Sequence, residues 1–167
     1  MRRYRMVHDQ ALTRFLIRNF PPGSFRTNVR LGPLPEKAYK ENITPEERNL
    51  YRVYCPRVDA IVFLPDKTLL IEYATYNNPQ KVFQVLNLTE AFLKDPDYAL
   101  YRNKPVIPCI VVPRSNFYLE ELCRKWGVEL FVDTQEDVLK YLQTLRPRYR
   151  EGHFSAFKGQ TPEGGGA

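Results

Sequence analysis

The sequence is poor in the residues that most often bind metals or form disulfide frameworks. Its 167 residues include three cysteines and two histidines. Cys55, Cys109 and Cys123 are odd in number, far apart and outside any CxxC pair. This pattern favours buried reduced thiols in a cytoplasmic protein over a zinc site. His8 and His153 lie near opposite ends of the chain, which leaves little for a histidine-based mechanism.

Long hydrophobic runs are also missing. No apolar run reaches the roughly 20 residues that a membrane-spanning helix needs, so we expect no membrane partner. Residues 1–5 are basic and polar, and the apolar positions after them are interrupted by His8, Asp9, Thr13 and Arg14. This start does not resemble a signal peptide, and we expect a cytoplasmic location.

The chain does contain enough apolar residues for one core. Hydrophobic residues make up 43% of the sequence, which suits a single domain over residues 1–145 with a polar surface insertion at 32–50. From residue 146 the composition becomes basic and then glycine-rich, so we expect residues 146–167 to form a flexible tail. The net charge of +6 predicts a surface that attracts polyanions such as nucleic acid.

The hydrophobic pattern predicts alternating helices and strands. Helical spacing marks residues 7–20, 80–94, 115–126 and 134–145, and strand patterns mark 24–31, 58–64, 69–74, 106–112 and 128–132. The second and third strands form an antiparallel hairpin around a turn at 65–68, and the later strand-helix-strand order requires parallel pairing. The expected fold class is therefore α/β, with a mixed central β-sheet flanked by helices in the order αβββαβαβα.

Several residues predict where helices begin and end. In the insertion, Thr44, Pro45 and Glu47 have the spacing of a capped short helix. Ser115 is the expected N-cap of the helix that Gly127 closes, and Thr134 with Asp137 marks the start of the last helix. Pro108 interrupts the strand at 106–112, which is tolerated at an edge or a bulge.

The hairpin carries two carboxylates within otherwise apolar strands. An even turn at 65–68 places Asp59 opposite Ala74 and Glu72 opposite Ile61. Both carboxylates then share one face, about 7 to 8 Å apart, close enough to converge on one cation. Burying an ionised carboxylate costs roughly several kcal/mol unless it is paired or bound to a metal. A divalent cation and Arg57 are the candidate partners, and exposure to solvent is the alternative.

The segments RVDAIV (57–62) and LIEYA (70–74) resemble the core hairpin of the PD-(D/E)xK superfamily, which includes Holliday junction resolvases, restriction enzymes and RecB-like nucleases. In element order the resemblance covers residues 7–145, whereas its motif is only a few residues. It implies a restriction-endonuclease-like core that hydrolyses phosphodiester bonds. It also implies that Asp59, Glu72 and the carbonyl of Tyr73 bind Mg²⁺ or Mn²⁺.

The chain departs from the family at the motif lysine. Ala74 stands two residues after the second acid, where the family has its lysine. Lys81, near Gln84 on the polar face of the central helix, is the candidate catalytic substitute, and a solvated helix lysine is the alternative. By the same resemblance, Gln80 and Gln84 look like the helix glutamines of RecB-like members, and Asp9 sits where some members carry another acid.

Arginines gather at both ends of the predicted domain and beside the hairpin. They are Arg2, Arg3, Arg5, Arg57, Arg146, Arg148 and Arg150. Because arginine can bind phosphate through two parallel hydrogen bonds, we predict that these residues contact nucleic acid. A solvated run of charge at the chain ends is the alternative.

Two functions remain open from the sequence. The first is a DNA nuclease dependent on Mg²⁺ or Mn²⁺, from a phage, a mobile element or a repair pathway. The second is a catalytically degenerate nuclease fold that binds DNA or a partner protein, or forms a homodimer, without cleavage. An assembly protein with an incidental basic surface is a third possibility.

Overall fold

The structure is a computed structural model and describes residues 2–145, with side chains described from residue 5 onward. One five-stranded sheet has the strand order β1-β2-β3-β4-β5. Its strands are β1 (Phe25–Arg30), β2 (Arg57–Phe63), β3 (Thr68–Tyr73), β4 (Val106–Val112) and β5 (Glu129–Val132). Pairing is antiparallel from β1 to β3 and parallel from β3 to β5. The predicted α/β class with a mixed sheet is confirmed.

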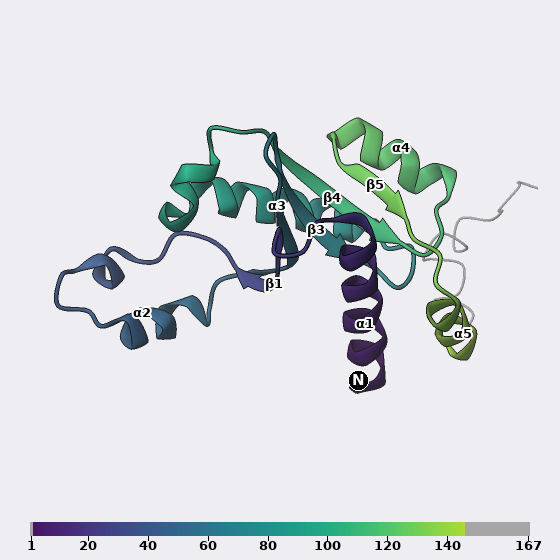
Figure 1. The fold of residues 1–167 in the computed structure, drawn as a ribbon, viewed down its shortest axis with the longest axis horizontal. Helices are drawn as coiled ribbons and strands as arrows, with labels where there is room; N and C mark the ends of the chain where they lie inside the picture. Colours follow the sequence, from purple (N-terminus) through teal and green to yellow (C-terminus); the bar gives the residue numbers. More distant parts are fainter. Residues whose placement is uncertain (1, 146–167) are drawn as a thin grey trace, which may run out of the picture.

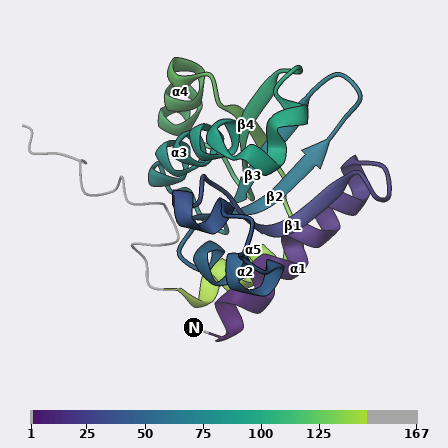
Figure 2. The same cartoon turned by 90° about the vertical axis from the view of Figure 1, so that its left-hand side faces the viewer.

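Helices cover both faces of the sheet, as Figure 1 and Figure 2 show from two sides. The longer helices are α1 (Arg2–Asn19), α3 (Gln80–Lys94), α4 (Phe117–Trp126) and α5 (Glu136–Thr144). Alternate side chains of β3 serve two cores: Ile71 packs in the cluster that contains Leu16 of α1, and Leu70 in the cluster that contains Phe92 of α3. Burial on both faces explains why this strand is apolar almost throughout. No helix between residues 2 and 145 is both long and apolar enough to span a bilayer.

Several predicted local features are confirmed. Gly127 ends α4 in the left-handed conformation, with φ at 65°, which glycine adopts without a steric penalty. Thr44 and Glu47 form the predicted capping box of α2 (Pro45–Arg52). Pro108 lies ahead of the first residue of β4 that pairs with β5, so this part of β4 is an edge on that side. The three cysteines are free thiols, and Cys109 and Cys123 are buried as predicted, whereas Cys55 is only half-buried.

Two predicted N-caps are wrong by one residue. Asn116, not Ser115, caps α4, because its side-chain oxygen accepts the backbone N–H of Leu119. The last helix, α5, follows Gln135, and Thr134 donates its hydroxyl to the carbonyl of Pro113 instead of capping. Sequence spacing thus placed both helices correctly but not their first turns.

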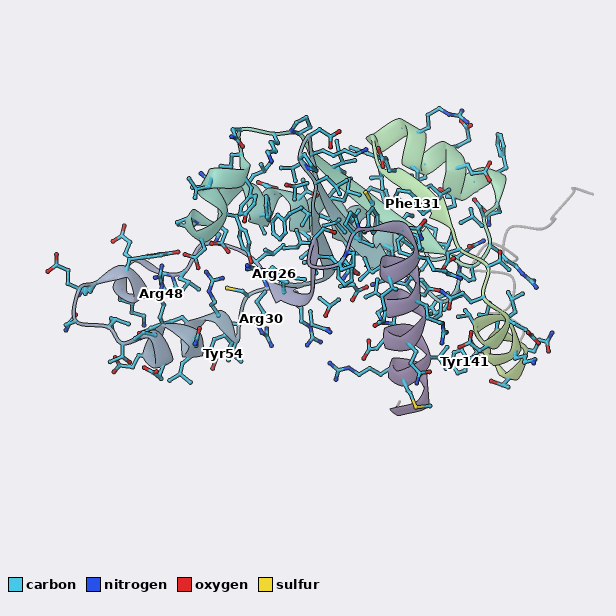
Figure 3. The ribbon with its side chains drawn as sticks, viewed as in Figure 1. Arg26, Arg30, Arg48, Tyr54, Phe131 and Tyr141 are labelled. Carbon is cyan, nitrogen blue, oxygen red and sulfur yellow. The ribbon has the colours of Figure 1, made fainter. Side chains whose placement is uncertain are left out.

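Residues 31–56 leave the sheet as an arm that contains a 3₁₀ helix, η1 (Glu36–Tyr39), and α2 (Figure 1). The arm includes the predicted insertion at 32–50. A fully buried carboxylate, Asp95, ties the arm to the body. It accepts the backbone N–H of Gly32 at 3.0 Å and two guanidinium contacts from Arg52 at 3.2 and 3.4 Å. Next to α2, Arg30 of β1 donates to the carbonyl of Cys55 at 2.9 Å (Figure 3).

We expect Asp95→Ala to lower the free energy of unfolding by about 2 to 3 kcal/mol, because it leaves the buried N–H of Gly32 without its acceptor and the half-buried guanidinium of Arg52 with only the more exposed Asp97 as a carboxylate partner. Urea denaturation measures the loss. Asp97→Ala is the matched control, since Asp97 contacts the same Arg52 from a side chain that is 43% exposed. An exposed pair of this kind contributes at most about 1 kcal/mol. Equal effects of the two substitutions would contradict the special role of Asp95.

Candidate active site

The β2–β3 hairpin has a register two residues away from the predicted one. Ala60 pairs with Ile71, and the same register continued places Asp59 opposite Glu72. The predicted register instead places Asp59 opposite Ala74. The two carboxylates are therefore nearest neighbours across the strands rather than diagonal ones.

The turn explains the shift. The backbone N–H of Leu64 donates to the carbonyl of Lys67 at 2.8 Å, so the turn occupies residues 64–67 instead of 65–68. The turn begins one residue early but keeps its even length. The alternation of side chains therefore stays in phase, and Asp59 and Glu72 still come together as predicted.

β2 and β3 separate next to the two acids. Their pairing ends at Ala60 and Ile71, beyond which β2 remains on β1 and β3 remains on β4. Side chains bridge the opening: the N–H of Asp59 donates to Oε1 of Glu72 at 3.1 Å, and the N–H of Tyr73 donates to Oδ2 of Asp59 at 2.9 Å. We call this opening the fork.

The neighbouring strand is irregular at the same level. Asn28 of β1 lies between Thr27 and Val29, which both pair with β2, and its position faces Asp59. Its φ is 56°, in the left-handed region that asparagine tolerates better than most residues. Backbone outliers of this kind persist where the surrounding structure holds them, and they concentrate at functional sites.

Lys81 of α3 contacts both carboxylates of the fork. Its Nζ lies 2.5 Å from Oε2 of Glu72 and 3.8 Å from Oδ2 of Asp59. The Glu72 side chain is fully buried, and those of Lys81 and Asp59 are only 17% and 20% exposed. The alternative that Lys81 is a solvated helix lysine is therefore wrong.

His8 of α1 reaches the fork from the other face of the sheet. Its Nε2 lies 3.2 Å from Oδ2 of Asp59 and 3.0 Å from the carbonyl oxygen of Tyr73, and its Nδ1 lies 3.0 Å from Oδ1 of Asp9. The sequence alone predicts no role for this histidine. The available signal was its place on the apolar stripe of the helix, four residues before Leu12.

The other predicted residues of the hairpin and helix do not contact the acids. Arg57, the proposed alternative partner of the carboxylates, is exposed, and in the described part of the chain the acids pair with His8 and Lys81 instead. Gln84 is also exposed. Together with Arg57 and Gln80, it lines a groove of about 630 Å³ between the start of β2 and α3.

The predicted arginine contacts are only partly described. Arg5 is exposed on α1, and Arg2 and Arg3 belong to the same helix, although their side chains are not described. The remaining predicted contacts, Arg146, Arg148 and Arg150, lie outside the described residues, as does the predicted tail at 146–167.

Burial and charge move the pKa values at the fork in different directions. Burial raises the pKa of Glu72, and the negative charge of Asp59 raises it further, against the opposing effect of Lys81. Burial alone would also raise the pKa of Asp59, but the hydrogen bond from His8 and the charge of Lys81 lower it below its ordinary value. Burial disfavours charged His8, yet Asp59 and Asp9 outweigh burial and raise its pKa.

Protonated His8 should stabilise the fold in a defined pH range. Because its pKa is higher in the folded chain, its contribution is complete below the unfolded value of about 6.5 and disappears as pH rises through the folded pKa. We expect His8→Gln to lose stability against the unsubstituted protein in mildly acidic buffer and to lose less in alkaline buffer. Urea denaturation across this pH range measures the difference. A gap that stays constant or widens with pH would contradict the assignment.

The donor set of the fork suits a divalent cation. Two carboxylates and the carbonyl of Tyr73 are the oxygen ligands that Mg²⁺ prefers, and Nε2 of a neutral His8 would suit Mn²⁺ as well. Asp9 at Nδ1 is the kind of partner that orients metal-binding histidines. Within residues 2–145, however, no three His, Cys, Asp or Glu side chains have the spacing of a preformed metal site. Lys81 and His8 instead contact the carboxylates directly.

Comparisons of the chain with known protein families, with curated proteins and with solved structures find no match. The family resemblance of the hairpin thus has no independent support from whole-chain similarity. Any function assigned to the fork has to rest on the residues gathered there and on their chemistry.

Proposed function

We propose that the protein is a metal-dependent phosphodiesterase that acts on nucleic acid, in the first instance a DNA nuclease with a PD-(D/E)xK-type core. The observation that carries the proposal is the convergence of Asp59, Glu72 and Lys81 at the fork. Two carboxylates with oppositely shifted pKa values beside a shielded ammonium group are costly for stability alone, and such clusters concentrate at catalytic sites.

Each residue of the fork has a separate role in this proposal. Asp59, Glu72 and the carbonyl of Tyr73 would hold Mg²⁺ or Mn²⁺. Such an ion, when bound, supplies a water of lowered pKa and positive charge beside the scissile phosphate. The ammonium group of Lys81 would orient that water or donate hydrogen bonds to the phosphate oxygens. His8, held through Asp9, would fix the orientation of Asp59.

The groove beside the fork supports a polyanionic substrate. Arg57 on its wall is two residues from Asp59 in sequence, and Gln80 on the opposite wall precedes Lys81. Phe83, 45% exposed, adds an aromatic surface on the same helix. Arginine, amide and aromatic side chains are those that bind phosphates and unpaired bases.

The direct test is to incubate the protein with labelled single-stranded, duplex and branched DNA in the presence of Mg²⁺ or Mn²⁺. We expect cleavage of at least one substrate with either ion and none with a chelator. DNA that is bound but never cut with any ion would contradict catalysis.

A second function is favoured by the contacts of His8. Its Nε2 already lies within hydrogen-bond distance of Asp59 and of the Tyr73 carbonyl, which are two of the proposed cation ligands. With Ala74 at the motif position, this arrangement suits a degenerate nuclease fold that binds DNA or a partner protein without cutting. For nucleic acid, that function predicts affinity that falls steeply with salt. Binding that does not change with salt would argue against it.

A further inference from the structure

A second concave site lies beyond the carboxyl ends of β3 and β4, where open α/β sheets commonly bind ligands. This pocket has a volume of about 240 Å³ and is lined by Tyr76, Asn77, Pro113, Arg114, Ser115, Asn116 and Leu142. Its volume is below the roughly 300 Å³ at which sites for drug-sized ligands begin, so it suits a small group. The pocket lies at the same end of β3 as the fork.

The walls of the pocket contain polar atoms without an internal partner. In the described part of the chain, Oδ1 of Asn77 and Oγ of Ser115 are buried and make no hydrogen bond, and neither does Oγ1 of Thr75, a fully buried residue in the same loop after β3. Buried polar groups are almost always hydrogen-bonded, so such atoms indicate a missing partner. A hydroxyl can donate, and rotation of an amide exchanges its oxygen for its NH₂ group. These walls can therefore donate to an acceptor.

Arg114 provides the positive charge of the pocket. Its side chain is exposed and, among the described side chains, has no ion-pair partner. Two arginines of α1 differ, since Arg14 pairs with Asp137 and Arg18 with Asp133, each at 2.6 Å. A guanidinium that is not paired with any acid of residues 5–145, beside hydroxyl and amide donors, is the arrangement that binds phosphate oxygens.

We propose that this pocket binds a phosphate group through Arg114, Ser115 and Asn77. Tyr76 follows Glu72 by four residues, which at full extension span about 14 Å. The pocket is therefore close enough to the fork for one nucleic-acid strand to reach both, and in that case the bound phosphate belongs to the strand that is cut, a link that rests on the proposed nuclease function. Inorganic phosphate or a free nucleotide would supply the same chemistry from another source.

The test compares Arg114→Ala and Ser115→Ala with Lys40→Ala, which removes one exposed positive charge from the arm. We expect Arg114→Ala to weaken binding of a short single-stranded oligonucleotide about tenfold and to reduce the salt dependence by about one phosphate contact. Ser115→Ala should weaken binding by a smaller factor, and Lys40→Ala should change neither quantity. In a parallel titration with inorganic phosphate at constant ionic strength, the amide NMR signals of Asn77 and Ser115 should shift in the unsubstituted protein and not in Arg114→Ala.

The outcomes separate this inference from the nuclease proposal. If the protein cleaves DNA but Arg114→Ala and Lys40→Ala bind the oligonucleotide equally well, the phosphate pocket is ruled out and the nuclease proposal stands. Phosphate-induced shifts at Ser115 without any oligonucleotide binding would support the pocket with a free phosphate as its ligand. If neither the oligonucleotide nor inorganic phosphate produces a response that depends on Arg114, the phosphate pocket is ruled out, and water is then the partner of its polar atoms.

Discussion

Replacing either acid of the fork by its amide, as Asp59→Asn or Glu72→Gln, should lower the rate of the proposed DNA cleavage by about a thousandfold or more, because each removes a charge that would bind the proposed cation. The amides have nearly the same size. Asn at position 59 can still accept the N–H of Tyr73, and Gln at position 72 that of Asp59. The fold should therefore survive, and single-turnover cleavage with Mn²⁺ should measure chemistry alone.

Metal affinity and a matched control make this result interpretable. Calorimetric titration with Mn²⁺ should detect binding to the unsubstituted protein and a loss of at least about tenfold in each variant. Asp66→Asn changes an exposed acid in the turn of the same hairpin and should leave both affinity and rate unchanged. Cleavage that survives both substitutions at the fork would place the chemistry elsewhere.

The fold was largely predictable because its signals are local. Alternating apolar residues mark the strands, and a turn of even length between 58–64 and 69–74 fixes which side chains come together. The exact turn was not predictable, since residues 64–67 and 65–68 offer similar turn chemistry around Pro65 and Asp66. Packing of the strands decides between them. Because the register shift is two residues, the prediction that Asp59 and Glu72 lie on the same face of the hairpin still holds.

The partners of the acids were less predictable because they depend on tertiary packing. His8 and Asp59 are 51 residues apart, and no periodicity in either segment relates them. Lys81 lies nine residues from Glu72, yet its contact depends on how α3 packs against the sheet. Arg57 was a reasonable alternative by proximity in sequence, but its side chain is exposed.

The fork explains how two helices on opposite faces of a sheet can serve one carboxylate. In a continuous sheet the backbone ladder between β2 and β3 would separate α1 from α3. Because the strands part beyond Ala60 and Ile71, the carboxylate of Asp59 is reached by His8 from one face and by Lys81 from the other. Separation of the strands also leaves the carbonyl of Tyr73 available to a side chain instead of to β2.

Lys81→Met should lower DNA cleavage and also remove the positive charge that balances the carboxylate of Glu72. Without the ammonium group, no residue of the described chain replaces it at Glu72, and cleavage should fall by about a hundredfold to a thousandfold. Lys81→Arg keeps the positive charge but replaces a compact ammonium group by a larger, planar guanidinium. Compared with Lys81→Met, it should therefore recover more of the stability than of the cleavage activity. Lys94→Met is the matched control, because Lys94 is an exposed lysine at the end of the same helix.

The stability of Lys81→Met should depend on pH in a direction fixed by Glu72. Burial and Asp59 already raise the pKa of this carboxyl, and loss of Lys81 raises it further. A carboxyl with a raised folded pKa costs stability as pH rises from its unfolded value toward the folded one. Relative to the unsubstituted protein, the variant should lose little near about pH 5 and about 3 kcal/mol or more near pH 8. The same loss of stability at both pH values, together with unchanged cleavage, would contradict both the electrostatic and the catalytic role of Lys81.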